Sequence, residues 1–161
     1  MKTAVYPGSF DPVTIGHVDI IRRGSRLFDQ LVVAVLHNPS KKSCFSIDQR
    51  LDFLRRSCEE IPNVRFDAFD GLLADYMRAV RADCVLRGLR SGVDLESEAP
   101  MAQLNRTLLP GLETVFLPAD PRYACVSSSA VREIGSFGGD LTPFVPACIA
   151  GDVARALISK P

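Results

Sequence analysis

The chain alternates short apolar strand patterns with amphipathic helical patterns along its whole length. The segment LVVAVL at residues 31–36 is apolar throughout, which is typical of a parallel strand covered on both faces. Four other short apolar runs are separated from it by segments whose apolar residues recur at helical spacing. We expect strands at residues 3–6, 31–36, 63–66, 84–86 and 113–117. This alternation predicts an α/β fold with a doubly wound, five-stranded parallel sheet of the Rossmann-like type.

A helical pattern follows each of these strands. Ser46 offers an N-cap for the second helix, whose apolar residues include Phe53 and Leu54. The other helices are expected at residues 16–28, 72–80, 101–108, 127–134 and 145–158. Because proline is tolerated in the first turn of a helix but kinks its interior, Pro100 predicts that the helix after the fourth strand begins near Glu98.

Size and charge exclude several classes of protein. The 161 residues predict a single domain spanning 1–161. Lys+Arg and Asp+Glu are both 19, and this zero net charge disfavours a nucleic-acid binder or a polybasic membrane binder. No apolar run approaches the roughly 20 residues that span a bilayer, and no signal-peptide pattern precedes the first strand. We therefore expect a cytoplasmic protein that binds neither nucleic acid nor membrane.

Metal-binding and common nucleotide-binding motifs are also missing from the sequence. Five cysteines contain no C-x-x-C pair, and with two histidines they give no zinc-ligand spacing, so no protein-held metal is expected. Neither G-x-G-x-x-G nor G-x-x-x-x-G-K-[ST] occurs, which disfavours a nicotinamide dehydrogenase or a P-loop NTPase.

The segment YPGSFDPVTIGH at residues 6–17 follows the first strand, where ligands bind in open parallel sheets. Gly8 allows a close approach of the backbone, and the Ser9 hydroxyl can bond a phosphate oxygen. Gly16 and His17 open a helix whose unpaired amides favour an anion. Taken alone, His17 is as readily an ordinary residue of the first helical turn.

Three further strand ends carry polar groups. The segment NPSKK at 38–42 follows the second strand, although two lysines in a loop are usually solvated. RGLR at 87–90 follows the fourth strand, and its alternative role is an ion pair with Asp94 or Glu96. VSSSAVRE at 126–133 follows the fifth strand and offers amides and hydroxyls to an anion, or plain N-capping.

These segments together resemble a known enzyme family. The residues at 6–17 are similar to the T/H-x-G-H signature of the nucleotidyltransferase superfamily. RGLR, followed by Asp94, Glu96 and Glu98 and by Asn105-Arg106, resembles the pantetheine-phosphate adenylyltransferase family within it. The resemblance runs in order and spacing from the first strand through the helix after Ser129.

The resemblance implies roles for individual residues. His17, with Lys41 and Arg90, is expected to be catalytic, His17 stabilising the transition state. Lys41 and Arg87 would hold the phosphate of 4′-phosphopantetheine, with Ser9 and Leu73 in the same acceptor site. The residues expected to bind ATP are Ser9, Phe10, His17, Gly88, Leu89, Arg90, Glu98, Tyr123, Ala124, Cys125, Val126, Ser127, Ser128 and Ser129.

The family reaction transfers the adenylyl group of ATP to 4′-phosphopantetheine, giving dephospho-coenzyme A and pyrophosphate. A phosphate monoester is already anionic at neutral pH, so no general base or covalent enzyme intermediate is required. The resemblance also implies Mg²⁺ bound with ATP, a homohexamer, and feedback inhibition by coenzyme A. Two alternatives stay open: another nucleotidyltransferase, for example one using CTP and glycerol phosphate, and a non-catalytic sensor of coenzyme A or a nucleotide.

Overall fold

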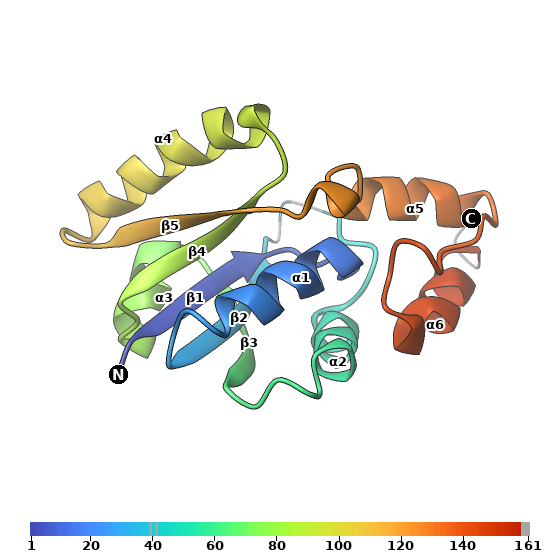
Figure 1. Ribbon diagram of the computed structural model, residues 1–161, viewed down its shortest axis with the longest axis horizontal. Helices are drawn as coiled ribbons and strands as arrows, with labels where there is room; N and C mark the ends of the chain where they lie inside the picture. Colours follow the sequence, from blue (N-terminus) through green and yellow to red (C-terminus); the bar gives the residue numbers. More distant parts are fainter. Residues whose placement is uncertain (39, 41, 159–161) are drawn as a thin grey trace.

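A single parallel sheet forms the centre of the computed structural model, which describes residues 1–38, 40 and 42–158. All four neighbouring strand pairs run parallel, so the sequence prediction of a five-stranded parallel sheet is confirmed (Figure 1). The strands are β1 (Thr3–Gly8), β2 (Gln30–His37), β3 (Val64–Asp70), β4 (Cys84–Leu89) and β5 (Glu113–Pro118), in the spatial order β3-β2-β1-β4-β5.

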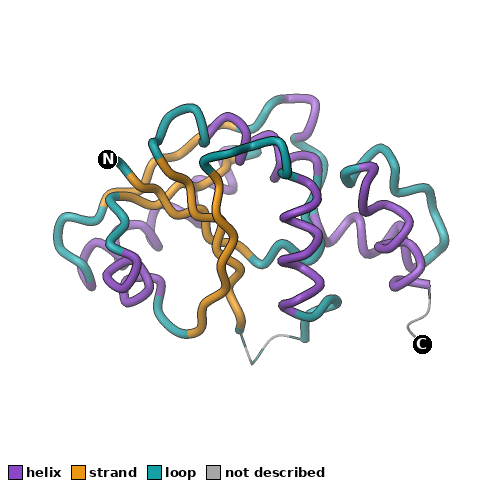
Figure 2. The backbone as a smooth tube through the Cα atoms, turned by 90° about the horizontal axis from the view of Figure 1, so that it is seen from below, coloured by secondary structure: helices purple, strands orange, loops and turns teal. Residues whose placement is uncertain are grey.

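Helices lie on both faces of this sheet (Figure 2). They are α1 (Ile15–Gly24), α2 (Ile47–Ser57), α3 (Leu73–Val80), α4 (Gly92–Leu108), α5 (Ser128–Ser136) and α6 (Ala147–Ile158), with a 3-10 turn η1 (Pro121–Tyr123) before α5. Apolar residues of α1, α2, α5 and α6 pack into one core, and those of α3 pack into a second core across the sheet. The chain is therefore wound on both sides of the sheet.

The two-residue period of a strand explains why both cores are filled. On β1, Ala4 and Tyr6 belong to the larger core, whereas Val5 between them belongs to the smaller one. On β2, Leu31, Val33 and Val35 face the larger core, and the residues between them face the smaller. A strand buried on both faces has no polar position, which is why the 31–36 segment is apolar throughout.

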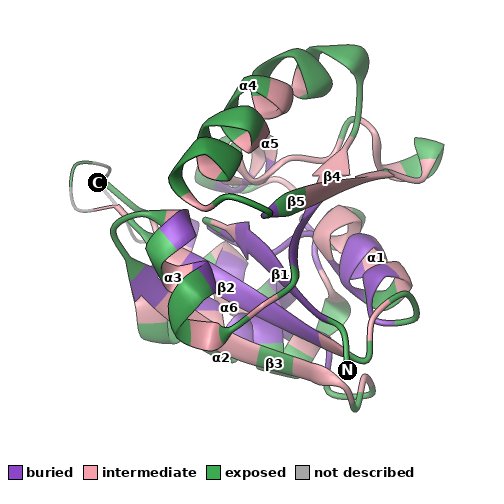
Figure 3. Cartoon of the chain, turned by 90° about the vertical axis from the view of Figure 1, so that its left-hand side faces the viewer, coloured by how far each residue is buried: buried purple, intermediate pink, exposed green. Residues whose placement is uncertain are grey.

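Helix α4 differs from its sequence prediction. It begins at Gly92, about two turns before Glu98, and Pro100 lies inside it. The hydroxyl of Ser91 caps the helix by accepting a hydrogen bond from the Asp94 N–H at 3.4 Å. No residue of α4 is buried, so water can bond the carbonyl that Pro100 leaves without a helical donor (Figure 3).

Helix α1 is shorter than its pattern predicts, because it ends at Gly24 and not at residue 28. The side-chain amide of Asn63 donates to the carbonyl of Ser25 at 2.7 Å and to that of Phe28 at 3.1 Å. A residue far along the chain thus holds this segment in a non-helical turn. The turn η1 was also not predicted, and within the described residues no helix is both long and apolar enough to cross a membrane.

The different burial of two leucines predicts that their replacement by alanine changes the free energy of unfolding by very different amounts. Leu54 on α2 is fully buried, whereas Leu27 is 59% exposed. We expect Leu54→Ala to lower the free energy of unfolding by about 2–5 kcal/mol, because it leaves a cavity in the larger core. Leu27→Ala should change it by less than about 0.5 kcal/mol. Urea unfolding measures both, and equal losses would contradict the assigned core.

Candidate active site

A cavity of about 330 Å³ lies at the carboxyl end of the sheet, beside β1 and β4. The strand order reverses between these two strands. From β1 the chain extends the sheet in one direction through β2 and β3, and it then returns to the other side of β1 to add β4 and β5. Ligands of open parallel sheets bind at such a switch point. The lining residues come from β1 and its following loop, α1, the β4–α4 segment, η1 and the start of α5. We call this space the first cavity.

The loop after β1 is held in an unusual conformation. Phe10 has a positive φ of 46°, which non-glycine residues rarely adopt, and its ring packs edge-on against those of Tyr6 and His17. A Cβ at Gly8 would lie 2.9 Å from the Phe10 ring, so only glycine fits there. Packing on both sides of the ring therefore fixes the backbone that borders the cavity.

A buried carboxylate ties this loop to the loop that follows β2. Asp11 is 7% exposed and accepts hydrogen bonds from the backbone N–H groups of Cys44 at 2.7 Å and Phe45 at 2.8 Å. Arg132 of α5 also donates to the Asp11 backbone carbonyl at 2.5 Å. The two loops that sequence analysis assigned to phosphate binding are thus joined by one side chain, a role not foreseen from the sequence.

His17 lies in the capping box that begins α1. The Thr14 hydroxyl accepts from the His17 backbone N–H at 3.3 Å, and the Thr14 backbone N–H donates to His17 Nδ1 at 3.0 Å. Since a backbone N–H can only donate, Nδ1 is an acceptor and the neutral ring carries its proton on Nε2. The cap therefore leaves Nε2–H as a donor with no acceptor among the described residues, on a ring that lines the first cavity.

Burial and two arginines keep this ring neutral. Loss of hydration, together with the positive charges of Arg90 and Arg87, lowers the pKa of His17 to about 4. At neutral pH the ring is a hydrogen-bond donor without charge of its own.

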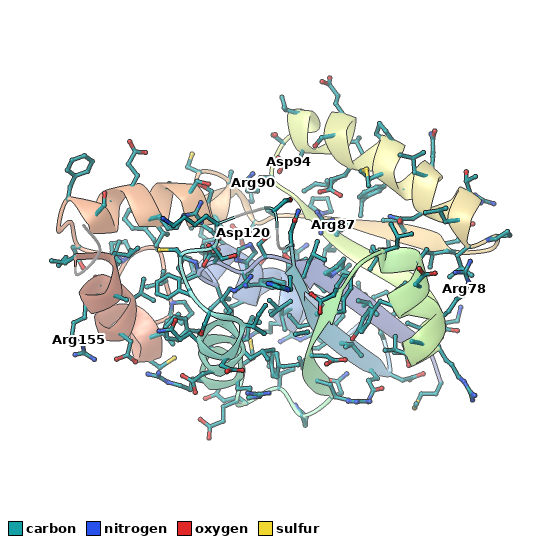
Figure 4. The ribbon with its side chains drawn as sticks, turned by 180° about the vertical axis from the view of Figure 1, so that it is seen from behind. Arg78, Arg87, Arg90, Asp94, Asp120 and Arg155 are labelled. Atoms are coloured by element: carbon teal, nitrogen blue, oxygen red, sulfur yellow. The ribbon has the colours of Figure 1, made fainter. Side chains whose placement is uncertain are left out.

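The arginines at the end of β4 pair with carboxylates of α4. Arg87 donates from Nε to Glu98 Oε2 at 2.8 Å and from Nη2 to Glu98 Oε1, and its Nη1 donates to the Pro7 carbonyl at 2.6 Å. Arg90 donates to Asp94 from its backbone N–H at 2.8 Å and from Nε at 3.1 Å. Figure 4 shows Arg87, Arg90 and Asp94 where β4 leads into α4.

These pairs meet the sequence expectations only in part. The ion pair of Asp94 was considered for this segment, whereas Glu98 was expected to bind ATP and here holds Arg87. Although burial opposes it, the hydrogen bonds from Arg90 hold the pKa of Asp94 below its usual range. Both arginines are thus neutralised by carboxylates within the cleft.

The N-terminus of α5 borders the same cavity. Ser127 caps the helix by accepting from the Ala130 N–H at 3.1 Å, and the Ser128 hydroxyl donates to the Pro12 carbonyl at 2.8 Å. Plain N-capping, the alternative considered from the sequence, therefore does occur. The first amides of a helix remain without helical acceptors, so α5 can still direct N–H groups at an anion.

A second cavity, of about 620 Å³, opens between α4, α3 and the sheet. Its lining is mostly apolar and includes Leu73, Phe69, Met101 and Leu104. The two cavities share the wall residues Pro7, Gly8, Ser9, Arg87 and Glu98. A polar cavity and an apolar cavity thus meet at the end of β1, on either side of the Arg87–Glu98 pair.

Most of the residues predicted from the sequence come together here. The first cavity is lined by Ser9, Phe10, His17, Arg87, Gly88, Arg90, Glu98, Tyr123, Val126, Ser127, Ser128 and Ser129. Leu73 lines the second cavity, whereas Leu89, Ala124 and Cys125 line neither. Lys41 lies outside the described residues.

Sequence reasoning missed several residues that shape the site. Tyr6, Thr14 and Asp94 line the first cavity, and Met101 and Leu104 line the second. Thr14 had a signal, because it stands three residues before His17 as a capping box requires. The pattern of Met101 and Leu104 predicted only a helix at 101–108, so nothing in it pointed to a ligand.

Comparison with known proteins gives the family. A profile described as cytidylyltransferase-like matches residues 5–134. The chain is 52% identical to the phosphopantetheine adenylyltransferase of Caldanaerobacter subterraneus subsp. tengcongensis, over 93% of this chain and 94% of that protein. It is 49% identical to the phosphopantetheine adenylyltransferase of Dictyoglomus thermophilum, over 100% and 98% of the two chains.

Solved structures agree on the fold. The bifunctional NMN adenylyltransferase/ADP ribose pyrophosphatase of Francisella tularensis matches with a TM-score of 0.75 at 10% identity, over 99% of this chain and 50% of that one. The lipopolysaccharide core biosynthesis protein of Thermoplasma volcanium matches with a TM-score of 0.53 at 22% identity, over 74% and 97%.

A parallel sheet in this order, with a helix-capping histidine at its switch point, defines the chain as a cytidylyltransferase-like nucleotidyltransferase of Rossmann-like fold. Identity near one half over almost the full length narrows the class to a single family. The chain belongs to the phosphopantetheine adenylyltransferases.

The capping geometry predicts the protonation state of His17. Long-range ¹H–¹⁵N correlation of the imidazole should show the neutral Nε2–H form from pH 8 down to pH 6, with titration near the pKa of about 4. Since the pKa in the unfolded chain is near 6.5, the unfolded chain binds more protons between those values. Stability due to His17 should therefore fall as pH drops through this window. The only other histidine is His37, so His37→Gln assigns the two signals, and an imidazolium His17 at pH 6 would contradict the geometry.

Proposed function

We propose that this protein transfers the adenylyl group of ATP to 4′-phosphopantetheine, releasing dephospho-coenzyme A and pyrophosphate. The observation that carries this proposal is the junction of two unlike cavities beside His17: a polar one bordered by two helix N-termini and an apolar one behind Arg87. Two phosphate-bearing substrates entering from these two sides would bring their phosphates together at the end of β1. The names of the close relatives support the same pair of substrates.

ATP fits the first cavity by its chemistry. Amide groups at the starts of α1 and α5 suit a polyphosphate, and Arg90 adds a positive charge beside them. Tyr123 and Gly88, which line this cavity, would provide surfaces for the adenosine moiety. Binding would require Arg90 to turn from Asp94 toward the phosphates, because the carboxylate holds it in the free protein.

The acceptor fits the second cavity. 4′-Phosphopantetheine is a long arm of methylene and methyl groups interrupted by two amides, with a phosphate at one end, and the cavity is a mostly apolar space that ends at an arginine. Arg87, with Lys41 from the loop after β2, would hold the acceptor phosphate. Leu73 and the apolar side chains of α4 would line the arm.

The reaction needs positioning and charge stabilisation more than acid–base catalysis. A phosphate oxygen of the acceptor bonds to the α-phosphorus, while the bond from that phosphorus to the bridging oxygen breaks and its electron pair leaves with pyrophosphate. The acceptor phosphate is already anionic at neutral pH. His17 Nε2–H donates to an α-phosphoryl oxygen as negative charge builds on it, and no covalent bond to the protein forms.

Mg²⁺ would enter with ATP. It prefers phosphate oxygens and water to a dedicated protein cage. Within the described residues, no group of three or more His, Cys, Asp or Glu side chains could hold a metal ion, and Asp94 and Glu98 at the cleft are paired with arginines. The metal would neutralise charge on the triphosphate, and the chain's own residues would orient the two substrates.

Three further properties belong to this proposal. Coenzyme A, which contains the pantetheine arm of the product, would inhibit by filling the same cavities. Helix α4 exposes Val93, Leu95 and Leu108 to 42–73%, and an apolar surface of this kind favours assembly, here as a homohexamer. A cytoplasmic location suits a coenzyme biosynthetic enzyme.

Pyrophosphate release tests the reaction directly. We expect release with ATP, Mg²⁺ and 4′-phosphopantetheine, together with dephospho-coenzyme A by mass spectrometry. CTP and glycerol 3-phosphate serve as swapped controls. Release with another pair would keep the superfamily and overturn the substrates, whereas coenzyme A binding without release from any pair would favour a sensor.

Removal of the His17 side chain tests the catalytic step. We expect His17→Ala to lower kcat by about 10²–10³-fold with a smaller change in KM, because it removes a donor that acts in the transition state. His37→Gln is the matched control, since His37 lines neither cavity. Near-normal kcat in His17→Ala would remove His17 from this role.

A further inference from the structure

The largest fully buried side chain of the described residues is a charged one, Arg50 of α2. It is 2% exposed, and on the same helix it neighbours Phe53 and Leu54, which are also buried. Burial of a guanidinium is costly unless its donors are bonded, and an apolar residue of similar size commonly gives equal or greater stability. The position of Arg50 therefore calls for a role other than core packing.

One contact of Arg50 reaches the loop that follows β1. Its Nε donates to the Ser46 carbonyl at 3.4 Å, within its own helix cap, and its Nη1 donates to the Ser9 carbonyl at 2.9 Å. The second contact is the shorter, and it spans 41 residues of sequence. Burial lowers the pKa of the guanidinium, and the negative charge of Asp11 opposes that shift.

Because the peptide unit is planar, the contact between Arg50 and the Ser9 carbonyl also determines the direction of the Phe10 N–H. The peptide bond between Ser9 and Phe10 is trans, so the Ser9 carbonyl and the Phe10 N–H point in opposite directions. Arg50 holds the carbonyl from the α2 side and does not line the first cavity, whereas Ser9 and Phe10 do. The Phe10 N–H is therefore directed away from Arg50, on the cavity side of the loop.

This amide has no acceptor in the part of the chain that the structure describes. The positive φ of Phe10 and the packing of its ring between Tyr6 and His17 fix the same peptide plane from the other side. A fixed, unbonded N–H at a polar cavity is a donor prepared for an anion.

We propose that Arg50 is a positioning residue for nucleotide binding: by holding the Ser9 carbonyl, it directs the Phe10 N–H at a phosphate oxygen. The positive charge of Arg50, on the carbonyl side of the same peptide, also strengthens the positive potential that the Phe10 amide presents to the cavity. The inference rests on the proposed function only in naming ATP as the source of the phosphate.

The test compares Arg50→Gln, Arg50→Lys and a matched control, Leu54→Ala, which damages the core from the same helix without touching Ser9. We expect Arg50→Gln to lower kcat/KM for ATP about 10-fold or more, because a charge-assisted bond is lost, while KM for 4′-phosphopantetheine changes less than about 3-fold. Arg50→Lys should recover part of the loss, since an ammonium can reach one carbonyl. Leu54→Ala should lower the melting temperature but leave kcat/KM for ATP within about 3-fold, because the loop contact is intact.

A second measurement follows the amide itself. In ¹H–¹⁵N spectra of the native protein, inorganic pyrophosphate should shift the Phe10 amide proton downfield, and in Arg50→Gln that shift should be lost. The same shift in the variant, or an equal fall of kcat/KM in Leu54→Ala, would overturn the positioning role. If Arg50→Gln does not fold, Arg50→Met, which fills a similar volume and cannot donate to the Ser9 carbonyl, takes its place, and an unaltered amide response with native kcat/KM in Arg50→Met would overturn the role as well.

The two measurements separate this inference from the proposed function. Failure of the native protein to release pyrophosphate from ATP and 4′-phosphopantetheine would overturn the function, and the amide response would still decide the role of Arg50. Turnover by the native protein together with native kinetics in Arg50→Gln would overturn the inference alone.

Discussion

The hydrogen bond from the Thr14 N–H to His17 Nδ1 serves both the fold and the site. As half of a capping box it begins α1, and it occupies the one ring nitrogen whose protonation would change the chemistry. The ring is thereby held as a neutral Nε2–H donor, and burial with two nearby arginines keeps it so by lowering its pKa. Because α1 is the first helix after β1, joined to it by the loop at residues 9–14, the same bond also fixes where along the sheet edge the donor stands.

A second constraint is the balance of charge inside the cleft. Arg87 and Arg90 end β4 on a sheet edge where anions would be drawn, and each is paired with a carboxylate of α4. The pair with Glu98 lowers the cost of the part-buried Arg87 guanidinium, whereas Arg90 is exposed and its pair with Asp94 offsets little burial cost. A phosphate entering either cavity competes with Glu98 or Asp94, so the net attraction for substrate is smaller than two free arginines would give. Helix α4 thus contributes both the wall of the apolar cavity and the carboxylates that hold the arginines.

Predictions from the sequence succeeded where the local pattern of residues allows only one structural interpretation. Alternating apolar runs predicted five parallel strands, and most of the segment at 6–17 lines the first cavity, whose binding of an anion stays a prediction. They failed where a distant contact decides the outcome. Asn63 ends α1 early, and the start of α4 depends on its Ser91 cap and on a solvated face that tolerates Pro100. The sequence analysis gave Arg50 no role, although the structure buries it.

By itself, the sequence determined the fold class, because local periodicity fixes the alternation of strands and helices. The motifs that resemble the family supplied most residues that line the first cavity, and they lie together because the strand ends of a parallel sheet share one edge. Only the tertiary structure decided that Glu98 pairs with Arg87, that Asp11 joins two loops, and that Arg50 holds the Ser9 carbonyl. The physical reason is the distance along the sequence over which each kind of interaction acts. Periodicity and capping act over a few residues, whereas each of these contacts joins different elements and depends on the distances and desolvation that packing creates.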